Sequence, residues 1–362
     1  MSVNYRIPIP VLGFRPPVYT CRYNDKPFHL DGNLDKDFWK DIPFTEDFPD
    51  IEGDIRPIPR FRTRAKLAWD RENLYIGAVL EGDEIWANLT EHDCVIFHDN
   101  DFEIFIDPDS DTQAYFEFEM NALNTTWDLL LTKAYRDNGK PVNGLEIRGM
   151  RTAVHIDGEL NNPEAHSRSW SVEVVMPFAA LQECAAENRP PVSGEYYRIN
   201  FSRVQWKVDV KEGAFRKLLS EETGRPLPED NWVWAPTGVI NIHYPELWAF
   251  VFFAGEGEDE KPFSIPEDEY RKWELRKLYY AQQACLDENG HYTDSLDELK
   301  EILARISPCE ENRTVQDLEY RLDTTSHGFE ITCLTGIIFW LFFPTERLQH
   351  FRCKVPQRAI YQ

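Results

Sequence analysis

The chain has 362 residues, of which 42% are hydrophobic and 14% aromatic, and its formal net charge is −24. This length predicts one large domain and a smaller unit, and the hydrophobic share is sufficient for a packed core, which favours a folded protein over a disordered one. The negative charge disfavours nucleic acids and anionic membranes as partners, because like charges repel, whereas neutral sugars and cations are compatible with it.

The N-terminal segment, residues 1–17, is rich in proline, and we expect it to form an extended arm. Its prolines interrupt the apolar residues, so the segment does not have the pattern of a signal peptide. On the sequence as it stands, we therefore expect a cytoplasmic protein.

Short strands are the main feature of residues 18–254. Arg64–Trp69 and Asn73–Leu80 flank a short polar turn and predict a hairpin. Asp101–Asp107, Ala114–Asn121 and Ser169–Met176 alternate between apolar and polar residues, which is typical of antiparallel strands that pack a core with one face and meet solvent or ligand with the other. Further strands are predicted at Thr125–Leu131, Arg151–Ile156, Tyr196–Arg203 and Leu247–Phe253.

This series of strands indicates the fold class. Many short strands between Gly, Asp, Asn and Pro loops favour a mainly β fold, an antiparallel β-sandwich of the immunoglobulin or jelly-roll kind, over a parallel α/β sheet. One short helix, Pro177–Glu183, is predicted to interrupt the strands, with proline at its first position.

The pattern changes to helix beyond the polar segment 255–261. Glu267–Leu286 spaces apolar residues for an amphipathic helix, and Ser295 begins a second helix, where Glu298 completes a capping box. Glu319–Leu322 and Phe329–Cys333 predict a hairpin. The resulting domain division is an arm over 1–17, a sandwich over 18–254, a linker over 255–261, a small helical or α+β unit over 262–335, and a tail over 336–362.

The tail contains an apolar run, Gly336–Phe343, which is too short to span a bilayer. We therefore expect no membrane span.

Several short motifs follow one another along the strand region. They are Asp31-Gly-Asn-Leu-Asp35 with Phe38-Trp39, the hairpin Leu67–Ile76, the strand Asn100–Asp107, Trp170-Ser-Val-Glu173 leading into Pro177-Phe178, Tyr197–Arg203, and Trp234-Ala-Pro236 with Pro245-Glu246. In this order they resemble family 9 carbohydrate-binding modules, and the helical addition is similar to that of the longer bacterial proteins of this kind. The resemblance covers Val18–Ala254. It implies binding of a poly- or oligosaccharide without catalysis, and it also implies export as an alternative location.

The resemblance further implies a sugar held between two aromatic rings, with polar side chains bonding its hydroxyls, because a pyranose has an apolar face and a rim of hydroxyls. Glu103 and Asn121 match an acid and an amide of that site. Phe97 and His243-Tyr244 stand near the two positions where the family has tryptophan, and Glu119 stands at a family arginine position.

Three further residues are candidates for the same site, each with a structural alternative. Trp127 could stack on a ligand or fill the sandwich, Trp206 lies near a loop where aromatic residues often bind, and Arg203 could donate to hydroxyls or pair with a carboxylate. For the matched residues the alternatives are a core position for Phe97 and solvated side chains for Glu103 and Asn121.

Alternate acids at Asp107, Asp109 and Asp111 resemble the first half of a calcium loop. The loop glycine is missing and Phe118 stands at position twelve, so this is not an EF-hand. Family 9 modules bind structural calcium, which supports the calcium hypothesis, while an ordinary solvated turn is the favoured alternative. No other cofactor is expected.

Two other functions remain open. A glycan-active enzyme needs two carboxylates facing each other across a cleft, and the many acids here include pairs such as Glu103 and Glu119. A haem-binding relative of the sandwich needs axial ligands, for which Met120 and His243 are present. We rank sugar binding first, the enzyme second and the haem domain third.

Overall fold

The computed structural model describes residues 5–257, 263–306, 319–333 and 339–342. The chain divides into two compact units. The first, the β unit, comprises Pro16–Ala134 and Gly139–Phe263; the second, the C-terminal unit, comprises Met1–Arg15, Tyr135–Asn138 and Ser264–Gln362. Most of the predicted linker and tail lies outside the described residues, and the domain boundaries given above stay a prediction.

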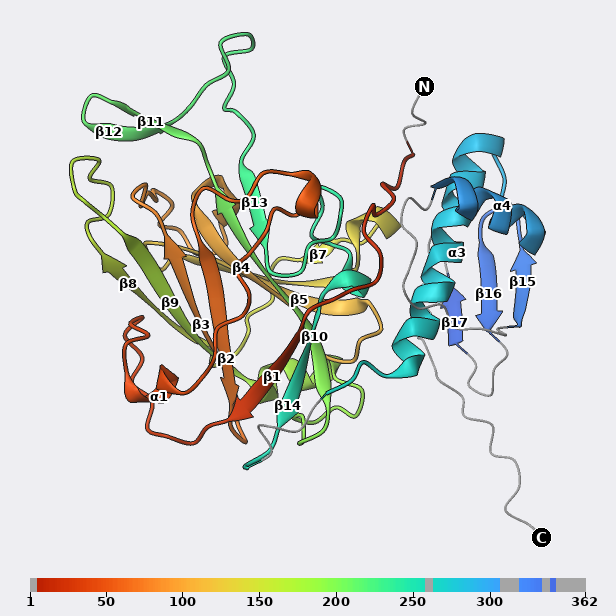
Figure 1. The fold of residues 1–362 in the computed structure, drawn as a ribbon, viewed down its shortest axis with the longest axis horizontal. Helices are drawn as coiled ribbons and strands as arrows, with labels where there is room; N and C mark the ends of the chain where they lie inside the picture. The colour runs from red at the N-terminus through yellow and green to blue at the C-terminus, as the bar shows by residue number, and fades with distance from the viewer. Residues whose placement is uncertain (1–4, 258–262, 307–318, 334–338, 343–362) are drawn as a thin grey trace. The chain divides into compact units, whose positions relative to one another are not determined.

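A twelve-stranded sheet forms the β unit, in the order β7-β6-β5-β4-β10-β14-β1-β2-β3-β9-β8, with β13 paired to β10 (Figure 1). The strands are β1 (Val18–Tyr23), β2 (Thr63–Trp69), β3 (Asn73–Glu81), β4 (Asp101–Asp107), β5 (Gln113–Asn121), β6 (Thr126–Lys133), β7 (Pro141–Val142), β8 (Arg151–Asp157), β9 (Ser169–Pro177), β10 (Tyr196–Gln205), β13 (Asp230–Val233) and β14 (Ala249–Ala254). A separate hairpin joins β11 (Val208–Lys211) to β12 (Ala214–Lys217). Two short helices, α1 (Asp37–Lys40) and α2 (Phe178–Leu181), complete the unit.

The sheet differs from the predicted antiparallel sandwich in one strand. β1 lies between β14 and β2 and runs parallel to both, so it joins the two expected sheets into one continuous mixed sheet. The remaining pairs are antiparallel, including the predicted hairpin of β2 and β3. The mainly β class is therefore confirmed, and the purely antiparallel arrangement is wrong.

The sheet curls around one hydrophobic core. Apolar residues of β2, β3 and β9 meet those of β4, β5, β10 and β14 in a single buried cluster. Figure 1 shows β8, β9, β3 and β2 side by side as one wall of this curled sheet. The alternation in the sequence predicted the core face correctly, with Phe102, Ile104 and Ile106 of β4 all inside.

Glu173 of β9 holds the segment that contains α1. Its buried carboxylate accepts hydrogen bonds from Trp39 Nε1 (2.7 Å), Gly32 N (2.8 Å) and Asp31 N (3.0 Å), and Lys36 Nζ lies 2.8 Å from it. Gly32 has a φ of +80°, and a Cβ there would lie 2.4 Å from the backbone of β8. The Asp31-Gly32…Trp39 motif and the Trp170-x-x-Glu173 motif therefore contact each other through the Glu173 carboxylate.

The C-terminal unit combines α3 (Glu267–Asn289) and α4 (Leu296–Ile306) with a sheet in the order β15-β16-β17. These strands are β15 (Tyr320–Thr324), β16 (Phe329–Cys333) and β17 (Phe339–Phe342), and the predicted hairpin of β15 and β16 is confirmed. In the N-terminal arm, Phe14 stacks on Trp273 at a centroid distance of 5.5 Å. Among the described residues, no helix has the length and apolarity needed to cross a membrane.

The predicted capping box of α4 is half correct. Ser295 Oγ accepts a hydrogen bond from Glu298 N at 3.3 Å, as expected for an N-cap. The Glu298 carboxylate accepts from Thr293 Oγ1 at 2.5 Å, and the backbone N–H of Ser295 donates to that same hydroxyl oxygen at 3.1 Å. The Thr293 hydroxyl therefore bridges the Glu298 carboxylate and the Ser295 N–H, which would bond directly to each other in a capping box.

Candidate functional site

A row of acids lies on the face of β4 and β5 that points away from the core. Glu103 pairs directly with Glu119 across the two strands, and Phe105 pairs with Glu117. Because side chains alternate along a strand, Asp101 also shares this face. We call the four carboxyl groups of Asp101, Glu103, Glu117 and Glu119 the acidic face.

The acidic face is covered by the protein itself, with each of its four residues 6% exposed or less. Two aromatic groups flank it along the strand direction. One contains Trp86, Trp206 and Phe215 with Phe97 packed against them, and the other contains Phe105, Tyr115 and Trp248 with Trp127 and Ile242. The sequence predicts that this polar strand face meets solvent or ligand, and the structure shows that it is not an open, solvated face, because its carboxyl groups are buried.

Some polar atoms on this face lack the partners that burial normally requires. Asp101 Oδ2, Glu117 Oε2 and Trp127 Nε1 have no hydrogen-bond partner among the described residues. Other atoms are satisfied: Glu119 Oε2 accepts from Phe97 N at 3.0 Å, and Asp101 Oδ1 accepts from Val204 N at 3.2 Å. The acidic face can therefore accept hydrogen bonds from a ligand at Asp101 and Glu117, and donate one to a ligand from Trp127.

Burial also changes the charge of the acidic face. Desolvation raises the pKa of Glu103 to about 7. It raises the pKa of Asp101, Glu117 and Glu119 well above the ordinary range, and neighbouring carboxylates raise each of these further. Near neutral pH, part of this face is protonated, so its carboxyl groups can donate as well as accept hydrogen bonds.

Asn121 lies at the edge of the acidic face, but its own protein occupies its side chain. Nδ2 donates to Leu89 O (2.9 Å) and to Asp99 Oδ2 (3.1 Å), while Oδ1 accepts from Leu123 N (3.0 Å) and Thr125 N (3.1 Å). The residue is fully buried. Through the two bonds of Nδ2, the Asn121 amide holds the loop that precedes β4.

The predicted aromatic candidates have different positions. Phe97 and Trp127 are half-buried at the acidic face. Trp206 is 8% exposed, its Nε1 donates to Phe97 O at 2.9 Å, and Lys217 Nζ lies 3.2 Å from its ring centroid. Trp206 therefore supports Phe97.

Arg203 does not lie on the acidic face. Ser202 pairs with Glu103, so the next residue, Arg203, points to the opposite side of β10. There its guanidinium donates to Thr63 Oγ1 at 3.0 Å and to Gln205 Oε1 at 2.7 Å, and burial lowers its pKa to about 9. None of these hydrogen bonds is to a carboxylate, and the role of donor to a sugar hydroxyl stays a prediction.

The neighbouring residues His243 and Tyr244 have different surroundings. The imidazole Nδ1 of His243 lies 2.9 Å from Tyr115 Oη, and its ring meets Phe105 edge-on. Tyr244 is fully buried. The haem alternative does not assemble, because Met120 lies in the core on the other side of β5 from Tyr115 and His243.

Glu117, Asp101 and Trp248 belong to the candidate site, and the sequence analysis did not assign them to sugar binding. The alternation in β5 carried the signal for Glu117, which is two residues before Glu119 on the same face. Trp248 falls within the predicted strand Leu247–Phe253, but no motif marked it as a site residue, and in the structure it lies directly before β14.

Within the part of the chain that the structure describes, three groups of residues have ligand atoms close enough to share a metal ion. Asp101, Glu103 and Glu119 form one, with oxygens within 4.8 Å of one another. The predicted calcium residues Asp107, Asp109 and Asp111 form a second, and His92, Asp93 and Asp128 form a third.

Fold and site together define a mainly β protein with a buried polar face between aromatic groups. Residues 30–189 match the family model described as "Carbohydrate family 9 binding domain-like". This match confirms the resemblance found in the sequence, and all of it except residues 135–138 lies in the β unit. A comparison with curated proteins gave no match.

Solved structures of a family 9 carbohydrate-binding module from Caldicellulosiruptor kristjanssonii are similar to this chain. The complex with cellotriose is 16% identical with a TM-score of 0.42, covering 69% of this chain and 99% of the module. The complex with glucose is 15% identical with a TM-score of 0.42, covering 68% and 100%. Similarity at this level does not transfer a binding site to this chain.

Proposed function

We propose that the β unit binds a neutral oligo- or polysaccharide on the acidic face, without catalysing a reaction. The observation that carries the proposal is the set of buried, unpaired atoms: Trp127 Nε1, Glu117 Oε2 and Asp101 Oδ2. A sugar hydroxyl can accept from the indole and donate to a carboxylate, so one ligand class satisfies all three. The family-model match over residues 30–189 supports the same class.

Each residue has a defined part in this proposal. The half-buried rings of Phe97 and Trp127 would pack on the apolar face of a pyranose. Glu103 and Glu117 would bond its hydroxyls, and Trp206 would hold Phe97 in place. Because the carboxyl groups are 6% exposed or less, the covering side chains must move before a sugar reaches them. That movement opposes binding, so we expect weak affinity.

The geometry favours binding over hydrolysis. Glycosidases place two carboxyl groups on either side of the scissile bond, about 5–5.5 Å or 6.5–9.5 Å apart. Glu103 and Glu119 instead project from neighbouring strands in the same direction, and their oxygens lie within 4.8 Å of each other. An assay for new reducing ends on the bound glycan checks this, and we expect none.

A glycan array on the full chain, followed by calorimetry with the best ligand, tests the proposal. Trp127→Phe keeps an aromatic ring but removes the indole N–H, and Glu117→Gln removes one carboxylate. We expect each to weaken binding about tenfold, since a hydrogen bond to a buried group is worth about 1–2 kcal/mol. Asp157→Asn, which alters an exposed ion pair with Arg168, is the control and should bind normally. Unchanged affinity in both site variants would place the site elsewhere, and a chain that binds no glycan refutes the function.

We also propose that Asp107, Asp109 and Asp111 hold calcium. The three residues supply only oxygen donors, which calcium prefers, and their oxygens lie within 4.8 Å of one another. Burial and the neighbouring carboxylates raise the pKa of Asp107 to about 7 and that of Asp109 to about 9. A divalent cation would offset the repulsion that these shifts reflect.

A further inference from the structure

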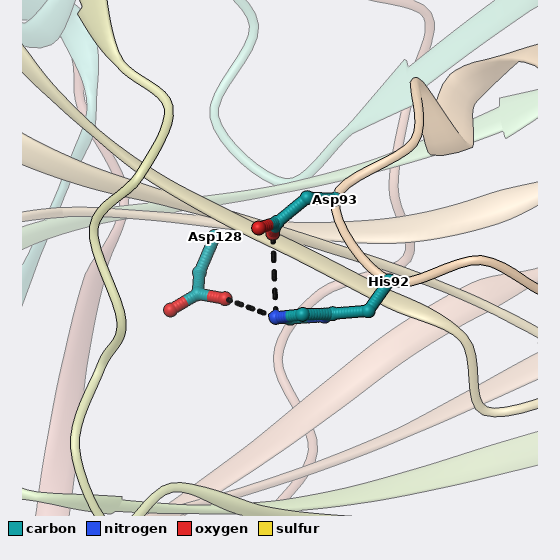
Figure 2. A group of neighbouring side chains, drawn as sticks. All are labelled: His92, Asp93 and Asp128. Atoms are coloured by element: carbon teal, nitrogen blue, oxygen red, sulfur yellow. Dashed lines mark ion pairs between the residues drawn. The ribbon is translucent and has the colours of Figure 1, made fainter.

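One histidine faces several carboxylates at the end of the sheet where β6 begins. His92 Nε2 lies 3.0 Å from Glu146 Oε1, 3.4 Å from Asp93 Oδ1 and 4.0 Å from Asp128 Oδ1. Figure 2 shows the ring of His92 pointing its nitrogen at the carboxylates of Asp93 and Asp128. The four residues come from three segments of the chain: the loop before β4, strand β6 and the loop before β8.

Both ring nitrogens of His92 have acceptors within hydrogen-bond distance. Nδ1 lies 3.0 Å from the backbone oxygen of Thr126 and 3.1 Å from its hydroxyl, and Nε2 lies 3.0 Å from Glu146 Oε1. A metal ion at Nε2 would take the place of the proton that Nε2 shares with Glu146, while Nδ1 keeps its bond to Thr126. A backbone carbonyl on the other nitrogen is the usual way in which proteins orient a metal-binding histidine.

Asp128 provides an independent observation. It is 1% exposed, and its Oδ2 accepts from Ile147 N at 2.5 Å. Its Oδ1 has no hydrogen-bond partner among the described residues and points at His92 Nε2. A buried carboxylate oxygen without a donor needs either a proton or a cation.

We propose that His92, Asp93, Asp128 and Glu146 form a binding site for a divalent transition metal of the zinc class. Zinc takes imidazole and carboxylate ligands at about 2.0–2.2 Å, which puts tetrahedral ligand atoms roughly 3.3–3.5 Å apart. The distances from Nε2 span this value, and the exposed Glu146 and His92 side chains can adjust to it. A nitrogen donor favours zinc, copper or nickel over calcium and magnesium, which prefer oxygen.

The site goes beyond sugar binding and does not depend on it. A metal here would join the segment of His92 and Asp93 to β6, and so fix the start of the loop that leads to Phe97. It is also distinct from the acids at 107–111, which offer no nitrogen.

Equilibrium dialysis of the full chain against zinc, with reductant present, measures the stoichiometry, and thermal unfolding with added zinc measures the stabilisation. We expect His92→Gln and Asp128→Asn each to remove one equivalent or to weaken it at least about tenfold, because even outer-shell partners of a metal site contribute that much. His29→Gln is the matched control, since His29 faces a single carboxylate, that of Asp31, at 3.9 Å. It should bind zinc as the unaltered chain does.

Magnesium in place of zinc should give no stabilisation through these residues. If His92→Gln binds and is stabilised by zinc as the unaltered chain is, the proposal is overturned, and the group is an ion pair between histidine and carboxylates. The exposed position of His92 makes misfolding of this variant an inadequate explanation, and far-ultraviolet circular dichroism of each variant checks that point.

Discussion

Asn121 shows how a side chain on a ligand-like strand face can serve the fold. All four of its hydrogen-bonding positions are filled by Leu89, Asp99, Leu123 and Thr125. Three of those partners are backbone groups, and two of the backbone groups are N–H donors that would lose their acceptor if the amide were removed. The sequence indicates an amide on a polar face but not how many of its bonds the protein itself makes.

We therefore expect Asn121→Ala to destabilise the chain by at least about 2 kcal/mol, because each buried group left unpaired costs about 1–3 kcal/mol. Urea denaturation followed by fluorescence measures this. Asn143→Ala, at an exposed position, is the control and should change stability by less than about 0.5 kcal/mol. A normal unfolding midpoint for Asn121→Ala together with lost glycan binding would show that Asn121 serves the binding site and not the fold.

Part of the candidate site was predictable, because alternation along a strand shows which side chains share a face. Alternation puts Glu103 on one face of its strand and Glu119 on one face of the next, and the structure pairs them. Alternation along β10 also places Arg203 on the same side as the core residues Ile199 and Phe201, away from Glu103. It cannot tell which strands distant in sequence pair, and that pairing brings β10 beside β4. Trp248 lies at the start of the predicted strand Leu247–Phe253, and no motif marks it as a residue that covers the acidic face.

At the scale of the elements, local patterns predicted most strands and both long helices. The predicted β4 has the observed bounds, and α3 begins at the predicted Glu267 and continues three residues beyond the predicted end, to Asn289 before Gly290. The direction of β1 was not predictable, because a six-residue strand carries no mark of the partners that it will have. That single strand converts the expected pair of sheets into one mixed sheet.

The loop between β4 and β5 gives a prediction at this scale. If Asp107, Asp109 and Asp111 bind calcium, millimolar calcium should raise the melting temperature of the chelator-treated chain, since a ligand that binds the folded state stabilises it by mass action. Asp109→Asn should remove most of that increase, while His92→Gln should retain it, which separates this site from the zinc site. An increase of equal size in Asp109→Asn would assign the calcium effect to other residues.

The molecule as a whole carries a formal charge of −24, and part of its acidity is buried. Carboxyl groups whose folded-state pKa exceeds the unfolded value bind protons more tightly in the folded chain. Glu103, Glu117 and Glu119 are such groups, since burial raises the pKa of each. Their contribution is fully present below the unfolded pKa, about 4.5, and is lost as pH rises through the folded pKa, which for Glu103 is about 7.

Stability should therefore fall between about pH 5 and pH 8, by up to about 1.4 kcal/mol per pH unit for each proton released. Urea denaturation across this range, with chelator present, measures the slope. Surface repulsion acts in the same direction, so a variant must separate the two causes. Glu103→Gln keeps the shape of the side chain and cannot ionise, and it should flatten the slope. Glu91→Gln removes the same charge from an exposed position and should leave the slope nearly unchanged. Equal slopes in the two variants would mean that the buried carboxyl group of Glu103 does not release its proton in this range, and that the pH dependence comes from the surface charge.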